Sequence, residues 1–155
     1  MKKISKQIFE ALHYLHKNNY IHRDLKPANI LIKEGMVKIC DFGFAKKLSA
    51  STAFVNSIKG TPLYIAPEIL NHQNYNYKVD IWSFGIIIYE LFDGKTPFHS
   101  STFQQLEPKI KYSSVKFSSS FPADLRELIT EMLQKIQITR ADWNYLKNHS
   151  FFAGN

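Results

Sequence analysis

The stretch HRDLKPANILIKEGMVKICDFG, residues 22–43, decides how the chain folds around its polar groups. Two short β-rich runs, residues 30–32 and 37–39, flank a Gly-containing turn and predict a β-hairpin. Asn29 comes directly before the first run, and Asp41 follows the second. Because hairpin strands are antiparallel, we expect Asn29 and Asp41 to converge just outside its open end.

Helical patterns surround this hairpin and predict a mainly α chain of the α+β class. Residues 4–17 have the apolar spacing of an amphipathic helix. Residues 79–92 are apolar nearly all round and predict a buried helix. Late helices are expected within residues 122–147, and residues 101–111 form a weaker helix candidate that Pro108 is expected to break.

Composition fits one ordinary globular domain. The 155 residues are 45% hydrophobic and 21% charged, which argues against disorder. The net charge of +7 is scattered and forms no basic and aromatic patch, so no nucleic-acid partner is expected. The single Cys40 permits no internal disulfide, which favours a reducing, cytoplasmic location. The longest apolar run, residues 81–92, is too short for a membrane span.

Three motifs occur in order: HRDLKPAN at 22–29, DFG at 41–43 and APE at 66–68. In these motifs the chain resembles eukaryotic-type serine/threonine protein kinases, which implies ATP, Mg²⁺ and protein substrates with serine or threonine hydroxyls. Phosphoryl transfer needs a carboxylate to accept the hydroxyl proton, and Asp24 is the candidate. Asn29 and Asp41 are the candidate metal ligands and cofactor-binding groups. Lys26 is a catalytic candidate that would meet the γ-phosphate.

The same resemblance assigns supporting roles. Residues 41–68 are expected to be the activation segment. Arg23, which directly precedes the candidate base, can pair with a phosphate group on that segment. Thr52 and Ser57 are the candidate phosphorylation sites, and no motif chooses between them. Further expectations are that Thr61 faces the substrate, that Glu68 and Arg140 form a buried ion pair, and that Asp80 holds the backbone around His22 and Arg23.

The histidines outside these roles have simpler interpretations. His22 is expected to be packed and hydrogen-bonded instead of shuttling protons. His13 and His16 lie one helical turn apart without a third ligand, and are interpreted as residues on a helix face.

The resemblance makes residues 1–155 a partial protein kinase domain, the C-terminal lobe alone. The sequence has no glycine-rich phosphate loop and no strand lysine, features of the N-terminal lobe that the family normally carries in the same chain. Little activity is therefore expected of this chain by itself. It is either a fragment of a full kinase, the interpretation favoured by the intact catalytic residues, or a single-lobe binding module or pseudokinase-like regulator. Within the family, DFGFAK at 41–46, GKTPF at 94–98 and RADW at 140–143 resemble the autophagy-initiating kinases.

Overall fold

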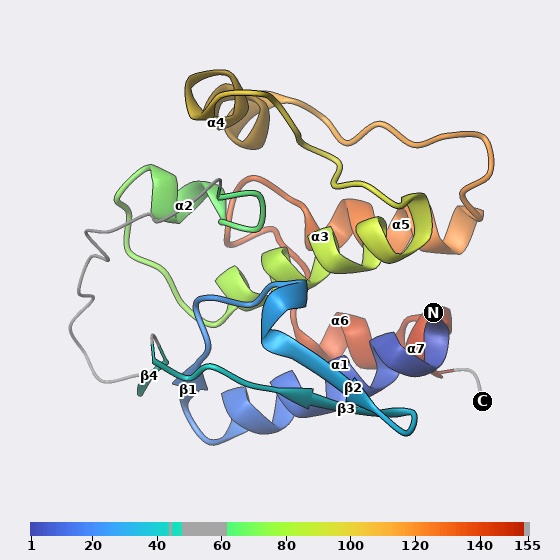
Figure 1. Cartoon of the computed structure of the whole chain (residues 1–155). Coiled ribbons are helices and arrows are strands. Elements are labelled where there is room, and N and C mark those ends of the chain that lie inside the picture. The colour runs from blue at the N-terminus through green and yellow to red at the C-terminus, as the bar shows by residue number, and fades with distance from the viewer. Residues whose placement is uncertain (44, 48–61, 154–155) are drawn as a thin grey trace.

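The computed structural model describes residues 1–43, 45–47 and 62–153. These residues form a helix-rich body with a small antiparallel hairpin on one side (Figure 1). The prediction of a mainly α chain with a small β region is therefore confirmed. No helix within the described ranges combines the length and apolar character needed to cross a membrane.

The first helix, α1, runs from Lys2 to Lys17. Its buried stripe includes Ile8, Phe9 and Leu12, at the spacing that predicted a helix over 4–17. The helix ends at Asn18, and Asn19 follows with a left-handed backbone (φ 63°), a conformation that asparagine tolerates better than most residues. This reversal leads the chain into the HRDLKPAN motif, residues 22–29, which is the candidate catalytic loop.

The hairpin consists of β2 (Ile30–Lys33) and β3 (Met36–Ile39), paired from Ile30↔Ile39 to Lys33↔Met36. Its two-residue turn, Glu34 and Gly35, has positive φ at both positions (51° and 75°), as a type I′ turn requires. The 3₁₀-helix η1 (Pro27–Asn29) leads into β2. The hairpin lies against α1 through β3 (Figure 1).

A second antiparallel pair joins β1 (Tyr20–Ile21) to β4 (Lys46–Lys47). The sequence did not indicate it, since strands of two residues carry no readable alternation. This pair joins the segment after the DFG motif to the two residues that directly precede the candidate catalytic loop.

The centre of the body is α3 (Lys78–Asp93), which is buried along eleven consecutive residues from Val79 to Tyr89. It ends at Gly94 in a left-handed conformation (φ 80°). Helix α5 (Ala123–Met132) packs against α3, and the short α2 (Pro67–Leu70) precedes it in the chain (Figure 1). The helix predicted over 79–92 thus forms the core to which the candidate catalytic loop is attached.

Helix α4 (Phe103–Tyr112) continues through Pro108, so the expectation that Pro108 breaks it was wrong. Two features offset the missing N–H. The side chain of Thr102 caps the first turn by accepting from Gln105 N–H at 3.4 Å, and Leu106 and Ile110 are fully buried. The late helices are α5, α6 (Trp143–Asn148) and α7 (Ser150–Ala153), with residues 133–142 between α5 and α6 in irregular structure.

Candidate active site

The open end of the hairpin brings together the residues that flank its two strands. Cys40 N–H donates to the Asn29 carbonyl at 2.9 Å, which extends the ladder by one bond beyond Ile30↔Ile39. Asn29, at the end of η1, is 6% exposed, and Asp41 directly follows Cys40. The backbone therefore places an amide side chain and a carboxylate side chain at one edge, as the sequence pattern predicts.

The Asp24 carboxylate lies at this edge between two donors. Lys26 Nζ is 3.1 Å from Oδ1 and 2.9 Å from Oδ2, and Asn29 Nδ2 donates to Oδ2 at 3.1 Å. The Asp24 side chain keeps 27% of its surface exposed, and that of Lys26 keeps 39%. A hydroxyl group can thus reach a carboxylate that is already held in place by hydrogen bonds.

The amide of Asn29 has a defined orientation. Its Nδ2 donates to the Asp24 carbonyl at 2.7 Å as well as to the Asp24 carboxylate, so both amide hydrogens are directed at one residue. Oδ1 is then the atom that remains for a cation. A carbonyl oxygen is a suitable magnesium ligand.

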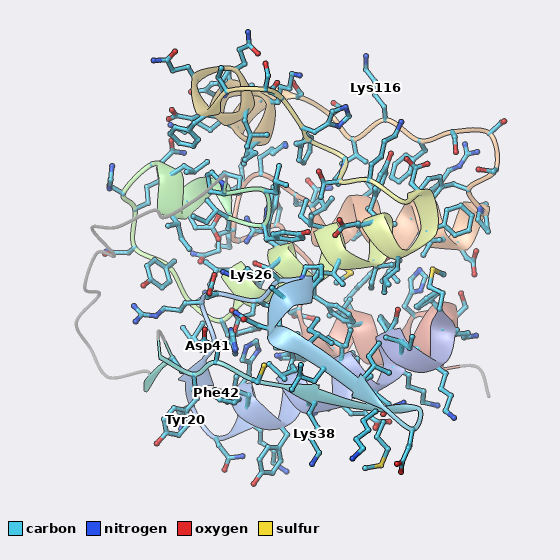
Figure 2. The ribbon with its side chains drawn as sticks, viewed as in Figure 1. Tyr20, Lys26, Lys38, Asp41, Phe42 and Lys116 are labelled. Carbon is cyan, nitrogen blue, oxygen red and sulfur yellow. The ribbon has the colours of Figure 1, made fainter. Side chains whose placement is uncertain are left out.

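Asp41 presents its carboxylate to solvent from a left-handed backbone conformation (φ 61°). Its Oδ1 accepts from Gly43 N–H at 3.3 Å, and Phe42 packs edge-on against the His22 ring at 5.2 Å. Figure 2 shows Asp41 and Phe42 on the same side of the molecule, with Lys26 nearer the centre. Aspartate, like asparagine, adopts this left-handed conformation more readily than most residues.

The donor set fits magnesium better than a transition metal. Within the described ranges no group of three or more His, Cys, Asp or Glu side chains could hold a metal ion. Magnesium bound with a nucleotide is held by one or two protein oxygens, phosphate oxygens and water. Asn29 Oδ1 and the Asp41 carboxylate are oxygen donors of this kind, so the residues present fit Mg²⁺ carried by a nucleotide phosphate.

Asp80 on α3 holds the backbone of the candidate catalytic loop by hydrogen bonds. His22 N–H donates to Asp80 Oδ2 at 2.8 Å, and Arg23 N–H donates to Oδ1 at 2.9 Å. Asp80 is fully buried, and Arg23 is left-handed (φ 70°). The two bonds offset the strain at Arg23 and direct Asp24, the next residue, towards the open edge.

Comparison with known proteins shows which family shares these residues. The family profile for the protein kinase domain matches residues 1–152. This chain belongs to the protein kinase domain family. It is 44% identical to serine/threonine-protein kinase TIO of Arabidopsis thaliana over 96% of its length and 11% of that protein. Identity is 40% to serine/threonine-protein kinase fused of Drosophila melanogaster, over 99% of this chain and 19% of that protein. With serine/threonine-protein kinase 36 of Mus musculus it is 41%, over 97% and 12%. The chain therefore spans between about a tenth and a fifth of these relatives.

In this kinase domain Glu68 and Arg140 form a fork-to-fork ion pair. Arg140 Nη1 lies 2.6 Å from Glu68 Oε1 and Nη2 lies 2.8 Å from Oε2, and both residues are at most 3% exposed. Arg140 also donates to the carbonyls of Gln134 and Lys78. The pair links α2, at the end of the expected activation segment (residues 41–68), to the irregular stretch that leads to α6.

Tyr64 anchors the last part of residues 41–68, the expected activation segment, to α3. Its hydroxyl donates to Glu90 at 2.7 Å, and its carbonyl accepts from Ser83 Oγ at 2.7 Å, so both contacts lead to α3. Burial, helped by the bond to Glu90, raises the pKa of Tyr64 well above its usual value, and the phenol stays neutral. The candidate residues Thr52, Ser57 and Thr61 of the same segment lie outside the described residues.

Arg23 directs Nη1 to the Tyr75 hydroxyl at 3.0 Å. His22 is fully buried: its Nδ1 accepts from Asp24 N–H at 3.3 Å, and its Nε2 contacts the Cys40 carbonyl at 3.0 Å. The network assigns the neutral imidazole with its proton on Nε2. His22 therefore connects the loop to the strand that carries Asp41.

Sequence reasoning missed the role of His16. His16 does lie on a face of α1, but on the buried face: it is 8% exposed and its Nε2 lies 2.7 Å from Asp80 Oδ2. One signal was available. His16 continues the spacing of Ile8 and Leu12, both core residues, by one more step of four.

Gln7 is a second residue that the pattern did not reveal. Its Nε2 donates to the Gly35 carbonyl at 2.9 Å, and its Oε1 accepts from Val37 N–H at 2.9 Å. Gln7 therefore fastens the closed end of the hairpin to α1, while the Cys40 to Asn29 bond fastens the open end.

Proposed function

We propose that this chain supplies the catalytic and metal-binding groups of a serine/threonine protein kinase, which transfers the γ-phosphate of ATP to protein hydroxyls. One observation carries the proposal: the Asp24 carboxylate is held by Lys26 and Asn29 at the edge where Asp41 is exposed. Membership of the protein kinase family and the serine/threonine kinases among its relatives support it.

Each residue has a stated task in this reaction. Asp24 orients the attacking hydroxyl and accepts its proton as the new O–P bond forms and the bond to the ADP oxygen breaks. Lys26, beside Asp24, neutralises negative charge that develops on the transferred group. Asn29 and Asp41 hold Mg²⁺, which when bound offsets the charge of the phosphates. The acceptor class, serine and threonine, is proposed from the resemblance that Lys26 carries.

We further propose that a second lobe must cover this site. Large hydrophobic side chains remain exposed around the hairpin: Leu31 is 57%, Met36 60% and Phe42 50% exposed. They offer an apolar surface on which ATP and a covering lobe can be buried. With one side of the nucleotide left in water, positioning is poor, and little transfer is expected from this chain alone.

The proposal is tested by joining the chain in frame to the preceding lobe of a serine/threonine kinase relative. The joined protein should phosphorylate serine and threonine peptides in Mg²⁺ and ATP, and should leave the matching tyrosine peptide unmodified. The present chain alone should give little or no product. If the joined protein folds with its two lobes packed together and still transfers no phosphate, the catalytic role is rejected in favour of a single-lobe binding module.

A further inference from the structure

A chain of hydrogen bonds leads from the last helices to the catalytic loop. The indole N–H of Trp143 donates to His16 Nδ1 at 3.1 Å, and His16 Nε2 lies 2.7 Å from Asp80 Oδ2. Asp80 in turn accepts from the backbone of His22 and Arg23. His16 on α1 and Trp143 on α6, 127 positions apart, are thus connected through Asp80 to the two residues that precede Asp24.

The chemistry of the indole group fixes the proton on His16. Tryptophan Nε1 is a donor and never an acceptor, so the ring nitrogen that faces it must be bare. The proton of the neutral imidazole is then on Nε2, where it is donated to the Asp80 carboxylate. The opposite tautomer would set two N–H groups against each other and a lone pair against a carboxylate.

The direction of the Asp80 carboxylate matters for the loop. Oδ2 accepts hydrogen bonds from His16 and from the His22 N–H, while Oδ1 accepts from the N–H of Arg23. Arg23 has φ 70°, a left-handed conformation that is unfavourable for a residue with a β-carbon. A carboxylate rotated by the loss of the His16 bond would release the N–H group that holds this conformation.

Trp143 is itself held independently of the loop. It opens α6, which is capped where Asp142 Oδ1 accepts from Tyr145 N–H at 2.8 Å. Its ring meets Phe9 edge-on at 5.3 Å and His13 at 5.2 Å, both from α1. The donor is therefore anchored by α1 and α6 before it acts on His16.

We propose that Trp143 is a positioning residue of the active site: its indole N–H selects the tautomer of His16 that orients Asp80, and Asp80 sets the backbone from which Asp24 projects. The inference rests on the proposed function only in taking Asp24 as the catalytic base. The hydrogen-bond relay itself does not depend on phosphoryl transfer.

The test uses the full chain labelled uniformly with ¹⁵N, so that the imidazole, indole and backbone N–H groups are all observed. With two tryptophans in the sequence, only two indole N–H signals need assignment. The wild type should show His16 as a single tautomer with its proton on Nε2, and a scalar coupling across the hydrogen bond from the Trp143 indole to Nδ1. A proton on Nδ1 in the wild type would overturn the proposal.

The variant Trp143→Phe keeps the aromatic packing and removes the donor. It should populate the Nδ1–H form of His16, and the backbone amides of His22 and Arg23 should exchange with solvent about five- to tenfold faster, the factor expected for one hydrogen bond. Tyr145→Phe is the matched control, since it removes a polar hydrogen from an aromatic ring on the same helix and should change neither reading.

Unchanged tautomer and unchanged exchange in a folded Trp143→Phe protein would also overturn the inference. If that variant fails to fold, the wild-type tautomer decides the question. A failure of the proposed function leaves these spectra as they are, because none of them requires ATP. The two proposals therefore stand or fall separately.

Discussion

At the level of single residues, the polar groups of this protein differ most in how far water reaches them. Glu68 and Arg140 face each other with almost no exposure, whereas Asp24 and Lys26 remain partly open. Burial strengthens an ion pair and also makes either partner costly to leave alone. The buried pair therefore serves the framework, and the open pair is accessible to a substrate.

Arg140→Met should lower the free energy of unfolding by about 3–5 kcal/mol, because it leaves the Glu68 carboxylate buried without its partner. Urea unfolding at neutral pH measures the change. Lys95→Ala is the control, since the Lys95 side chain is 67% exposed and lies 4.0 Å from Asp93, and its loss should cost less than about 1 kcal/mol. Similar losses in both variants would refute a structural role for the Glu68–Arg140 pair.

Lys135 is an amine held in aromatic surroundings. Its Nζ lies 3.9 Å from the Phe98 ring centre and 4.9 Å from that of Trp82, and it donates to the Ile110 carbonyl at 2.7 Å. Burial, and next the charge of Arg140, lower the pKa of Lys135 to about 8. In the unfolded chain a lysine keeps its proton up to about pH 10.4.

The sign of the pH dependence follows from these two values. Between about pH 8 and about pH 10 the unfolded chain binds more protons at Lys135 than the folded protein, so the stability gained from this residue rises with pH. We expect the wild type to gain stability relative to Lys135→Met over that interval in urea unfolding. Lys116→Met, at an exposed lysine (Figure 2), should follow the wild type; equal slopes in all three proteins would contradict the assignment.

At the level of elements, local pattern was sufficient where a segment makes its own structure. The hairpin follows from two β-rich runs around a turn with Gly35, and α3 follows from apolar residues on every side. Pro108 shows where local rules fail: the burial of Leu106 and Ile110 keeps α4 together despite the proline. The β1–β4 pair needs a partner distant in sequence, and no local pattern announces it.

Close packing between α3 and α5 depends on Gly85. A β-carbon there would lie 2.9 Å from Met132 Cβ and 3.0 Å from Leu133 Cδ2. Although alanine favours a helix over glycine by about 1 kcal/mol, overpacking costs about 1–3 kcal/mol, so Gly85→Ala should destabilise the protein. Thermal unfolding measures it against Leu91→Ala, at an exposed position of the same helix. A higher melting temperature for Gly85→Ala would show that the interface can relax.

At the level of the whole molecule, the candidate site is an assembly of distant segments. Motif spacing identified Asp24, Lys26, Asn29 and Asp41, since these residues come from one continuous stretch. The bonds from Asp80 to the backbone of His22 and Arg23 were expected from the family resemblance. The contacts of Asp80 with His16, and of His16 with Trp143, could not be deduced, because they join residues 64 and 127 positions apart. Such pairs become visible only when the helices are packed.

The need for a second lobe gives a prediction for nucleotide binding. A ligand that binds only the folded protein raises the midpoint of thermal unfolding by an amount that grows with the logarithm of one plus the ratio of ligand concentration to Kd. We expect Mg²⁺ with ATP to change the melting temperature of this chain little. The surface around Leu31, which is 57% exposed, would contact the nucleotide on one side and leave its other side in water. A clear rise that Asp41→Ala abolishes would show that the chain binds the nucleotide without a covering lobe.

The central claim is that Asp24 is the base of a phosphoryl transfer to serine or threonine. Its most direct test is the rate of γ-phosphate transfer to a serine peptide by the chain joined to a relative's preceding lobe, with and without Asp24→Asn. General base catalysis predicts a fall of about 10²- to 10⁴-fold in kcat, with Lys116→Met unchanged as a control. A joined protein that phosphorylates the peptide equally well with asparagine at this position would contradict the account.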